Sequence, residues 1–275
     1  DNIAEQGAGI LLSNSRSTLN NVTVSGNNAT DDGGGMSIES STAHLNNVDI
    51  IQNTALDDGG GIFVYDWDPN YPLSSTFTHV TISGNTANDG GGMFLNSSNP
   101  TFTNSIIWNN SPESIDIDAY YGNLPSTLTI IYSDIEGGWE GEGNIDADPL
   151  FTDPENTDYT LQEDSPCIDA GTADTDGDGY EDITDYCGSA PDMGAYEYIT
   201  EDCMEEEIIA GDINFDGVLD ILDVVTIINY ILLGDEWNNG NPPSEEQTIA
   251  ADVNEDGFVD ILDIVTLIQI ILSRI

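Results

Sequence analysis

Short stretches in which every second residue is apolar recur through the first 110 residues of the chain. In Val22-Thr23-Val24, as in its counterparts, alternate side chains would face one interior, which is the period of a β-strand. Four such strips align and end in Asn: Leu19, Val22, Val24 and Asn27; Leu45, Val48, Ile50 and Asn53; Phe77, Val80, Ile82 and Asn85; Phe102, Ser105, Ile107 and Asn110. The repetition predicts short strands that stack coil upon coil, with like residues above one another.

Glycine-rich segments precede apolar stretches at the same intervals. They begin at residues 7, 33, 59 and 90, which gives a period of 26 to 31 residues. Glycine at such places marks tight corners that need a positive φ or a close approach of two backbones. A period near 26 with two or three short strands in each coil describes a parallel β-helix, whose coils stack about 4.8 Å apart. The aligned asparagines are then predicted to form a structural ladder at one corner.

The hydrophobic pattern near the C-terminus differs, because two 13-residue stretches are apolar nearly all round. They predict helices over residues 221–233 and 261–273, with polar residues at matching positions. Two helices this short cannot bury two full apolar surfaces in each other, so part of this surface is expected to contact another surface. We expect the partner-binding residues at the start of each helix, namely Ile221, Leu222, Ile261 and Leu262.

A twelve-residue acidic pattern immediately precedes and overlaps each of these helices. Both copies have oxygen side chains at positions 1, 3, 5, 9 and 12 and a glycine at position 6. Ca²⁺ needs six or more oxygen ligands, with the carbonyl of position 7 among them, and the glycine allows the sharp turn. The predicted ligands are Asp212, Asn214, Asp216, Val218, Asp220 and Asp223 in the first loop, and Asp252, Asn254, Asp256, Phe258, Asp260 and Asp263 in the second.

A third loop with the same pattern lies further upstream, and no long apolar helix follows it. Five acidic side chains so close together would repel one another without a cation. We therefore expect a third, structural Ca²⁺ site that fixes the end of the β-helix. Its predicted ligands are Asp174, Asp176, Asp178, Tyr180, Asp182 and Asp185.

The duplicated loop and helix over residues 210–275 resemble a type I dockerin. In that family each half is a Ca²⁺ loop followed by one helix, with Asp at loop position 12, as at Asp223 and Asp263. The resemblance implies two Ca²⁺ sites and docking to cohesin modules in an extracellular assembly. Near the end of both loops, just before the last Asp, the chain carries Ile-Leu, where dockerins that bind cellulosomal cohesins often carry polar residues. The expected partner is therefore a cohesin-like module or another copy of the chain.

The repeats of the first half resemble the right-handed β-helix family that includes pectate-lyase-like proteins and bacterial surface proteins. The segment from Tyr132 to Tyr198 resembles the closing segment of many secreted β-helix proteins. The expected fold is thus an all-β, right-handed parallel β-helix (a solenoid) over residues 1–200, closed by about residues 136–200. A linker over 201–209 and a small α-helical dockerin-like domain over 210–275 are expected to follow.

Charge and cysteine content restrict the location and the partners. The chain has 52 acidic residues, two Arg and no Lys, for a net charge of −50, which excludes nucleic acid and anionic lipid as partners. It has no apolar run long enough to span a membrane. Loops of this kind fill at the millimolar calcium found outside cells, so we expect a secreted, extracellular or cell-surface protein, and a mature or trimmed chain. A disulfide is then allowed between Cys167 and Cys187, with Cys187–Cys203 as the alternative.

No catalytic residue is assigned from the sequence. Without Lys the chain lacks a common base for polysaccharide elimination, and carboxylates are too plentiful to single out a hydrolytic pair. Tyr65, Trp67 and Tyr71 form a candidate carbohydrate-binding group. The leading interpretation is a non-catalytic, calcium-binding extracellular structural or attachment protein, with self-assembly into a filament as one form of it. The alternatives are a dockerin-tethered polysaccharide-degrading enzyme and a carbohydrate-binding module.

Overall fold

The computed structural model describes residues 2–66, 74–118, 126–200, 203, 209–233, 243–254 and 256–273. The chain divides into two compact units, Asp1–Cys203 and Met204–Ile275. The first is a parallel β-solenoid of about five turns, and the second is a small helical region. The predicted fold class is therefore confirmed.

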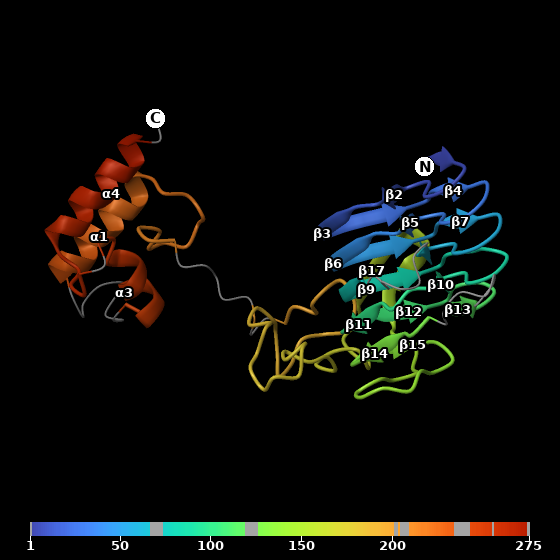
Figure 1. The fold of residues 1–275 in the computed structure, drawn as a ribbon. Helices are drawn as coiled ribbons and strands as arrows, with labels where there is room; N and C mark the ends of the chain where they lie inside the picture. The colour runs from blue at the N-terminus through green and yellow to red at the C-terminus, as the bar shows by residue number, and fades with distance from the viewer. Residues whose placement is uncertain are drawn as a thin grey trace. The chain divides into compact units, whose positions relative to one another are not determined.

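Three stacks of parallel strands form the walls of the solenoid, and Figure 1 shows successive coils following one another from blue to green. The first stack contains β1 (Ile3–Ala4), β4 (Asn28–Ala29) and β7 (Thr54–Ala55). The second contains β2 (Ile10–Ser13), β5 (Met36–Glu39), β8 (Ile62–Tyr65), β10 (Met93–Asn96) and β13 (Ile115–Asp118). The third contains β3 (Arg16–Ser25), β6 (Thr42–Ile51), β9 (Thr76–Ser83), β11 (Thr101–Thr103), β12 (Ile106–Trp108), β14 (Thr129–Ile131) and β15 (Asp134–Ile135).

The interior of the solenoid is built from the residues that the alternation predicts. Leu19 pairs with Leu45, Leu45 with Phe77, and Phe77 with Phe102, so one column of apolar side chains runs through successive coils. The rings of Phe77 and Phe102 are stacked, with centroids 4.3 Å apart, and both are fully buried. Because each coil covers the apolar face of the previous one, the core is continuous along the solenoid.

The predicted asparagine ladder is present and buried. Asn53 Oδ1 accepts hydrogen bonds from both the backbone N and Nδ2 of Asn27, each at 3.0 Å. The same arrangement links Asn53 to Asn85 and Asn85 to Asn110. Each amide therefore ties one coil to the next and satisfies backbone groups at a corner that strand pairing leaves open.

The glycine-rich corners are required by close backbone packing between coils. Gly59 has a φ of 67°, in the left-handed region that disfavours a side chain. A Cβ on the next residue, Gly60, would lie 2.5 Å from the carbonyl oxygen of Thr86 and 2.6 Å from that of Gly91. Both glycine functions expected from the sequence, turning and close approach, occur at this corner.

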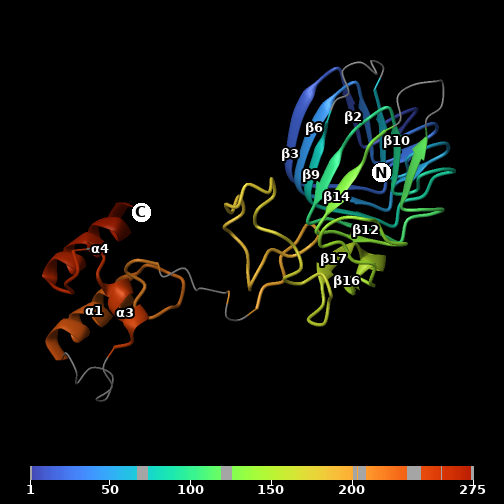
Figure 2. The same cartoon turned by 60° about the horizontal axis from the view of Figure 1, so that its bottom comes forward.

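The closing segment packs on the outside of the third stack. Its antiparallel hairpin consists of β16 (Phe151–Asp153) and β17 (Asp158–Leu161), joined by the short 3-10 helix η2 (Pro154–Asn156), and Figure 2 shows it beside β12. A buried cluster joins Leu161, Cys167 and Met193 of this segment to Ile106 of β12. The segment thus covers outer-face apolar residues that would otherwise meet solvent.

The disulfide joins Cys187 to Cys203, with Cα atoms 5.6 Å apart, so the Cys167–Cys187 pairing is wrong and the alternative holds. Cys167 is instead a buried thiol in the cluster beneath β12, and its Sγ donates to Asp134 Oδ2 at 3.3 Å. Burial first, and then the negative charge of Asp134, raise the pKa of this thiol. Packing of the closing segment thus buries Cys167 in the cluster beneath β12, so that it does not pair with Cys187.

The helical unit contains α1 (Ile221–Leu233), α3 (Glu245–Ala251) and α4 (Ile261–Ser273). Helices α1 and α4 have the bounds that the apolar pattern predicts, and they pack on each other around Ile227 and Leu267. Helix α3 is not predicted. Its signal in the sequence is a capping box, in which Gln247 N donates to Ser244 Oγ at 3.2 Å and Ser244 N donates to Gln247 Oε1 at 3.0 Å. None of the described helices is long and apolar enough to cross a membrane.

Candidate calcium sites and docking surface

In the first acidic loop of the helical unit, backbone N–H groups donate hydrogen bonds to side-chain carboxylates of the same loop. The carboxylate of Asp212 accepts hydrogen bonds from the backbone N of Asp216, at 3.2 Å, and of Gly217, at 2.8 Å. Asp216 Oδ1 accepts from Val218 N at 2.9 Å, and Gly217 has a φ of 78°. The glycine therefore makes the sharp turn that a Ca²⁺ loop requires at position 6.

The second loop repeats this geometry almost bond for bond. Asp252 accepts from Asp256 N at 3.1 Å and from Gly257 N at 2.8 Å, and Asp256 Oδ1 accepts from Phe258 N at 3.0 Å. Gly257 has a φ of 87°. Two sequences forty residues apart thus fold into the same local structure, which argues that the loop is a functional unit.

Position 12 of each loop connects the loop to the following helix. Asp223 and Asp263 are fully buried in the first turns of α1 and α4, and their Oδ2 atoms accept from the backbone N of Asp220 and Asp260, at 2.9 and 2.7 Å. Asp223 Oδ1 is buried and has no hydrogen-bond partner within the described residues, whereas Asp263 Oδ1 accepts from Asn254 N at 3.1 Å. A buried carboxylate oxygen without a partner is costly, and a cation in the loop would satisfy it. The residues present therefore fit a Ca²⁺ ion.

The third loop, in the β-helix unit, shares only the first half of this geometry. Asp174 accepts from Gly177 N at 2.7 Å and from Gly179 N at 2.8 Å. One carboxylate oxygen from each of Asp174, Asp176 and Asp178 lies within 4.8 Å of the other two. Asp182 Oδ2 instead accepts from the backbone N of Thr175, at 3.0 Å, and Asp185 is exposed. Because no helix follows this loop, Asp185 at position 12 has no helix against which it could be buried.

The predicted docking residues lie on the surface of the helical unit. Ile221 and Ile261 are 65% and 68% exposed, and Leu222 and Leu262 are 57% and 54% exposed. Val225 and Val265, one turn further along, are also exposed. The duplication therefore presents nearly the same apolar surface twice, and the acidic loop next to each copy fixes where its helix begins.

Comparison with protein families identifies both parts of the chain. The model of the right-handed β-helix region matches residues 8–138, and the model of the dockerin type I domain matches residues 210–272. The helical unit matches a type I dockerin domain, and residues 210–272 are called the dockerin domain. Dockerin domains of this type are generally calcium-binding, bind cohesins, and typically occur in extracellular proteins. No curated protein and no solved structure matches the chain.

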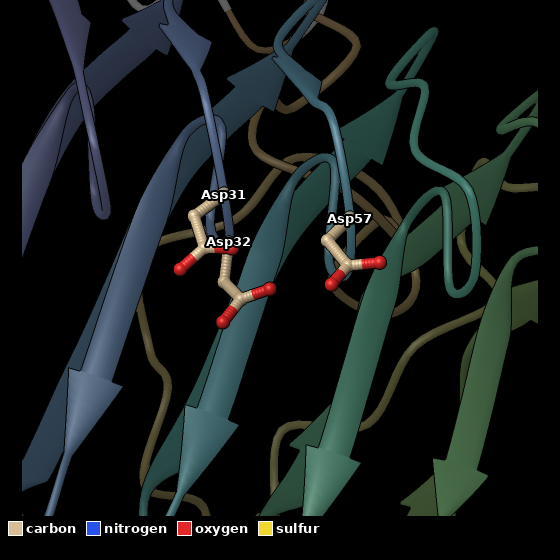
Figure 3. A group of neighbouring side chains, drawn as sticks. All are labelled: Asp31, Asp32 and Asp57. Carbon is tan, nitrogen blue, oxygen red and sulfur yellow. The ribbon is translucent and has the colours of Figure 1, made fainter.

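Outside the dockerin domain, the glycine-rich corners of the β-helix carry acidic groups that sequence reasoning missed. Asp31 and Asp32 in one coil lie beside Asp57 in the next, as Figure 3 shows, and a second group consists of Asp89, Glu113 and Asp116. The signal in the sequence is an acidic pair or Asn-Asp before each glycine triplet. Burial first, and then the neighbouring carboxylates, raise the pKa of Asp58 to about 7. These groups form an acidic column, which concentrates negative charge along one edge of the solenoid.

Of the candidate carbohydrate-binding residues, only Tyr65 lies within the described residues. Tyr65 ends β8, and its ring is stacked near that of Phe63, with centroids 6.4 Å apart. Trp67 and Tyr71 lie outside the described residues. A sugar-binding role for this group stays a prediction.

We expect the β-helix to become more stable as the pH falls from about 7.5 to about 5. Burial raises the pKa of Asp49 and of Asp134 to about 6 and that of Glu197 to about 7. The folded state then binds protons more tightly than the unfolded state, so stability increases as the pH falls through these values towards about 4. Because one pKa unit corresponds to about 1.4 kcal/mol, the three carboxyls together contribute on the order of 5 kcal/mol over this range. Burial lowers the pKa of His79 to about 4, which opposes the gain by about 2 kcal/mol and leaves about 3 kcal/mol.

Urea unfolding of the β-helix at several pH values, in buffers freed of calcium with a chelating resin, measures this gain without a contribution from calcium. Asp49 Oδ2 accepts a hydrogen bond from the Tyr196 hydroxyl, and its Oδ1 is buried without a partner within the described residues. Asp49→Asn keeps an acceptor for Tyr196 and removes the titrating group, so the variant is expected to show a smaller pH dependence. Stability that falls steadily between these pH values would contradict the interpretation.

Proposed function

We propose that the protein is a secreted, non-catalytic, calcium-binding structural or attachment protein, whose dockerin domain docks the β-helix onto a protein partner outside the cell. The observation that carries this proposal is the direct connection between each acidic loop and a helix with an exposed apolar face. Position 12 of each loop is a buried residue of that helix. Binding a cation and presenting the docking surface are thus parts of one folding event.

Each dockerin loop is proposed to hold one Ca²⁺, which supplies positive charge to a domain rich in carboxylates. In the first loop the ligands are the side chains of Asp212, Asn214, Asp216, Asp220 and Asp223 with the carbonyl of Val218, and the second loop uses the equivalent residues. The orphaned Oδ1 of Asp223 supports this assignment. The third loop is proposed to hold a structural Ca²⁺ through Asp174, Asp176 and Asp178, which already lie close together.

An extracellular location fits the same chemistry. A chain with a net charge of −50 repels itself strongly, and millimolar divalent cations screen and partly neutralise this charge. The Cys187–Cys203 disulfide forms and persists in an oxidising compartment. Both features support function in a calcium-rich medium outside the cell.

The partner is proposed to be a cohesin-type module that packs on the first turns of α1 and α4. Replacing Ile221, Leu222, Ile261 and Leu262 together by serine is expected to weaken binding at least about 100-fold, since apolar anchors at the centre of an interface contribute most of its affinity. Surface plasmon resonance against a cohesin module in millimolar Ca²⁺ measures the loss. Circular dichroism should show unchanged helical content, because these side chains are exposed.

A matched control is Ile249→Ser, which removes an exposed apolar side chain from α3 and should leave the affinity unchanged. Sedimentation of the unmodified chain in millimolar Ca²⁺ tests the second candidate partner, another copy. Association that increases with protein concentration, and that the fourfold serine variant abolishes, would identify self-assembly. A chain that neither binds cohesin modules nor self-associates would contradict the proposed docking role.

A further inference from the structure

A polar cleft lies within the β-helix unit, between the third stack of strands and the segment that carries the third acidic loop. Its volume is about 390 Å³, within the range of small-molecule sites. On the solenoid side it is lined by Asn46, Asn47 and His79, and on the closing-segment side by Asp182, Asp185 and Glu197. Asp182 and Asp185 also stand at positions 9 and 12 of the third acidic loop, but the structural Ca²⁺ proposed for that loop is held by Asp174, Asp176 and Asp178.

His79 occupies a special place in this wall. It has a φ of 53°, like the asparagines at the same corner of neighbouring coils, Asn47 and Asn104. The side chain is 7% exposed, and its Nε2 lies 2.8 Å from Asn104 Nδ2. Asparagine adopts this left-handed conformation more readily than histidine does. The presence of histidine at this corner, where neighbouring coils have asparagine, therefore indicates a role for the imidazole itself.

The hydrogen bonds around Asn104 fix the protonation of this imidazole. Thr172 N donates to Asn104 Oδ1 at 2.8 Å, so the amide oxygen is the acceptor and Nδ2 is the donor. Nδ2 donates to the Thr172 carbonyl at 2.8 Å and to His79 Nε2. Since Nε2 must accept, the neutral ring carries its proton on Nδ1. Nδ1–H has no protein partner within the described residues and is not among their buried unpartnered atoms, so it is an accessible donor at the wall of the cleft.

The opposite wall is held in place by its own hydrogen bonds. Glu197 accepts from Asp192 N at 3.0 Å and from Cys187 N at 3.5 Å. Asp182 accepts from the backbone N of Thr175 at 3.0 Å and from its hydroxyl at 2.6 Å. Each carboxylate still has lone pairs to offer, so the cleft combines fixed acceptors with the donor of His79 and the amides of Asn46 and Asn47.

We propose that this cleft is a binding site for a neutral, hydroxyl-rich ligand, namely a sugar residue. Hydroxyl groups both donate and accept, so they can satisfy the carboxylates and the imidazole N–H together. An anionic sugar would meet three carboxylates with no Lys or Arg among the lining residues. An apolar ligand would bury these polar groups without partners. The site would give the β-helix a contact to glycan that is separate from docking through the dockerin domain.

Histidine NMR provides a direct test, because the chain has only two histidines. His44 serves as an internal reference, since it is exposed on β6 and its Nδ1 lies 2.8 Å from Thr76 Oγ1. In the full chain labelled with ¹⁵N-histidine at fixed millimolar Ca²⁺, we expect His79 to be the Nδ1–H tautomer. Titration with cellobiose, xylobiose and mannobiose should shift the His79 signals saturably for at least one sugar and leave those of His44 in place. Digalacturonate should shift neither.

The matched variants are His79→Asn and His44→Asn. Asparagine already occupies the His79 position in neighbouring coils, so His79→Asn should keep the fold, as judged by an unchanged melting temperature. It removes the Nδ1–H donor and should weaken sugar binding, measured by calorimetry, at least about tenfold, whereas His44→Asn should bind as the unmodified chain does. The proposal is overturned if no neutral sugar shifts His79 up to tens of millimolar, if both histidines shift equally, or if His79→Asn binds with unchanged affinity.

Discussion

Replacing Asp223 and Asp263 together by alanine is expected to unfold the dockerin domain and to weaken partner binding at least about 100-fold. Each residue is proposed to supply the position-12 ligand, and each accepts the backbone N–H of position 9 at the start of its helix. Without the ligand the loop loses its cation, and the apolar core around Ile227 and Leu267 is too small to hold the domain together alone. Circular dichroism would record loss of the helical signal, and surface plasmon resonance the loss of affinity.

The control for charge is a pair of substitutions in the third loop, Asp174→Ala and Asp176→Ala. They remove the same two negative charges but lie in the β-helix unit, outside the two dockerin loops. The helical signal and the affinity for the partner should therefore stay unchanged. Equal loss of binding in both double variants would mean that total charge, rather than the two dockerin loops, governs docking.

Asn53→Ala is expected to destabilise the β-helix by at least about 4 kcal/mol, because four side-chain hydrogen bonds are lost from a fully buried position. Asn53 Oδ1 accepts two bonds from Asn27, and Nδ2 donates to the Val24 carbonyl at 2.9 Å and to Asn85 Oδ1 at 3.1 Å. Alanine leaves the backbone N of Asn27 buried without a partner, which costs about 1–3 kcal/mol, and removes the side-chain hydrogen bonds to the Val24 carbonyl and to Asn85.

Urea unfolding, followed by the change in β-sheet circular dichroism, measures this loss. Asn28→Ala is the matched control, because Asn28 is the exposed neighbour of the ladder residue Asn27. Its replacement should change stability by less than about 0.5 kcal/mol. A similar stability for both variants would show that the ladder contributes little, and that apolar stacking alone holds the coils together.

Much of this architecture could be predicted because it repeats. In a parallel β-helix, like residues lie above one another, so one period of the sequence gives the register of Leu45 with Phe77 and of Asn53 with Asn85. The bounds of α1 and α4 followed from the same logic, since the two halves of the dockerin domain share one pattern of loop and helix.

The features that were missed depend on contacts that a period does not encode. The pairing of Cys187 with Cys203 depends on how the irregular closing segment folds back and buries Cys167. The cleft at His79 joins that segment to a coil about one hundred residues earlier. Helix α3 is short, and its capping box at Ser244 was the only local sign of it. Most of the acidic column could have been found, because Asp31, Asp32, Asp57 and Asp89 precede glycine triplets, whereas Glu113 and Asp116 do not.

Hydrogen exchange of the full chain, with Ca²⁺ and then with EGTA, tests most directly whether calcium folds the docking module. Peptides from α1 and α4 report on the dockerin domain, and peptides from β6 and β9 report on the β-helix in the same sample. We expect the amides of α1 and α4 to exchange as in an unfolded chain in EGTA and to regain protection when Ca²⁺ is restored, while β6 and β9 stay protected throughout. Full protection of α1 and α4 after exhaustive chelation would contradict the proposed coupling of calcium binding to docking.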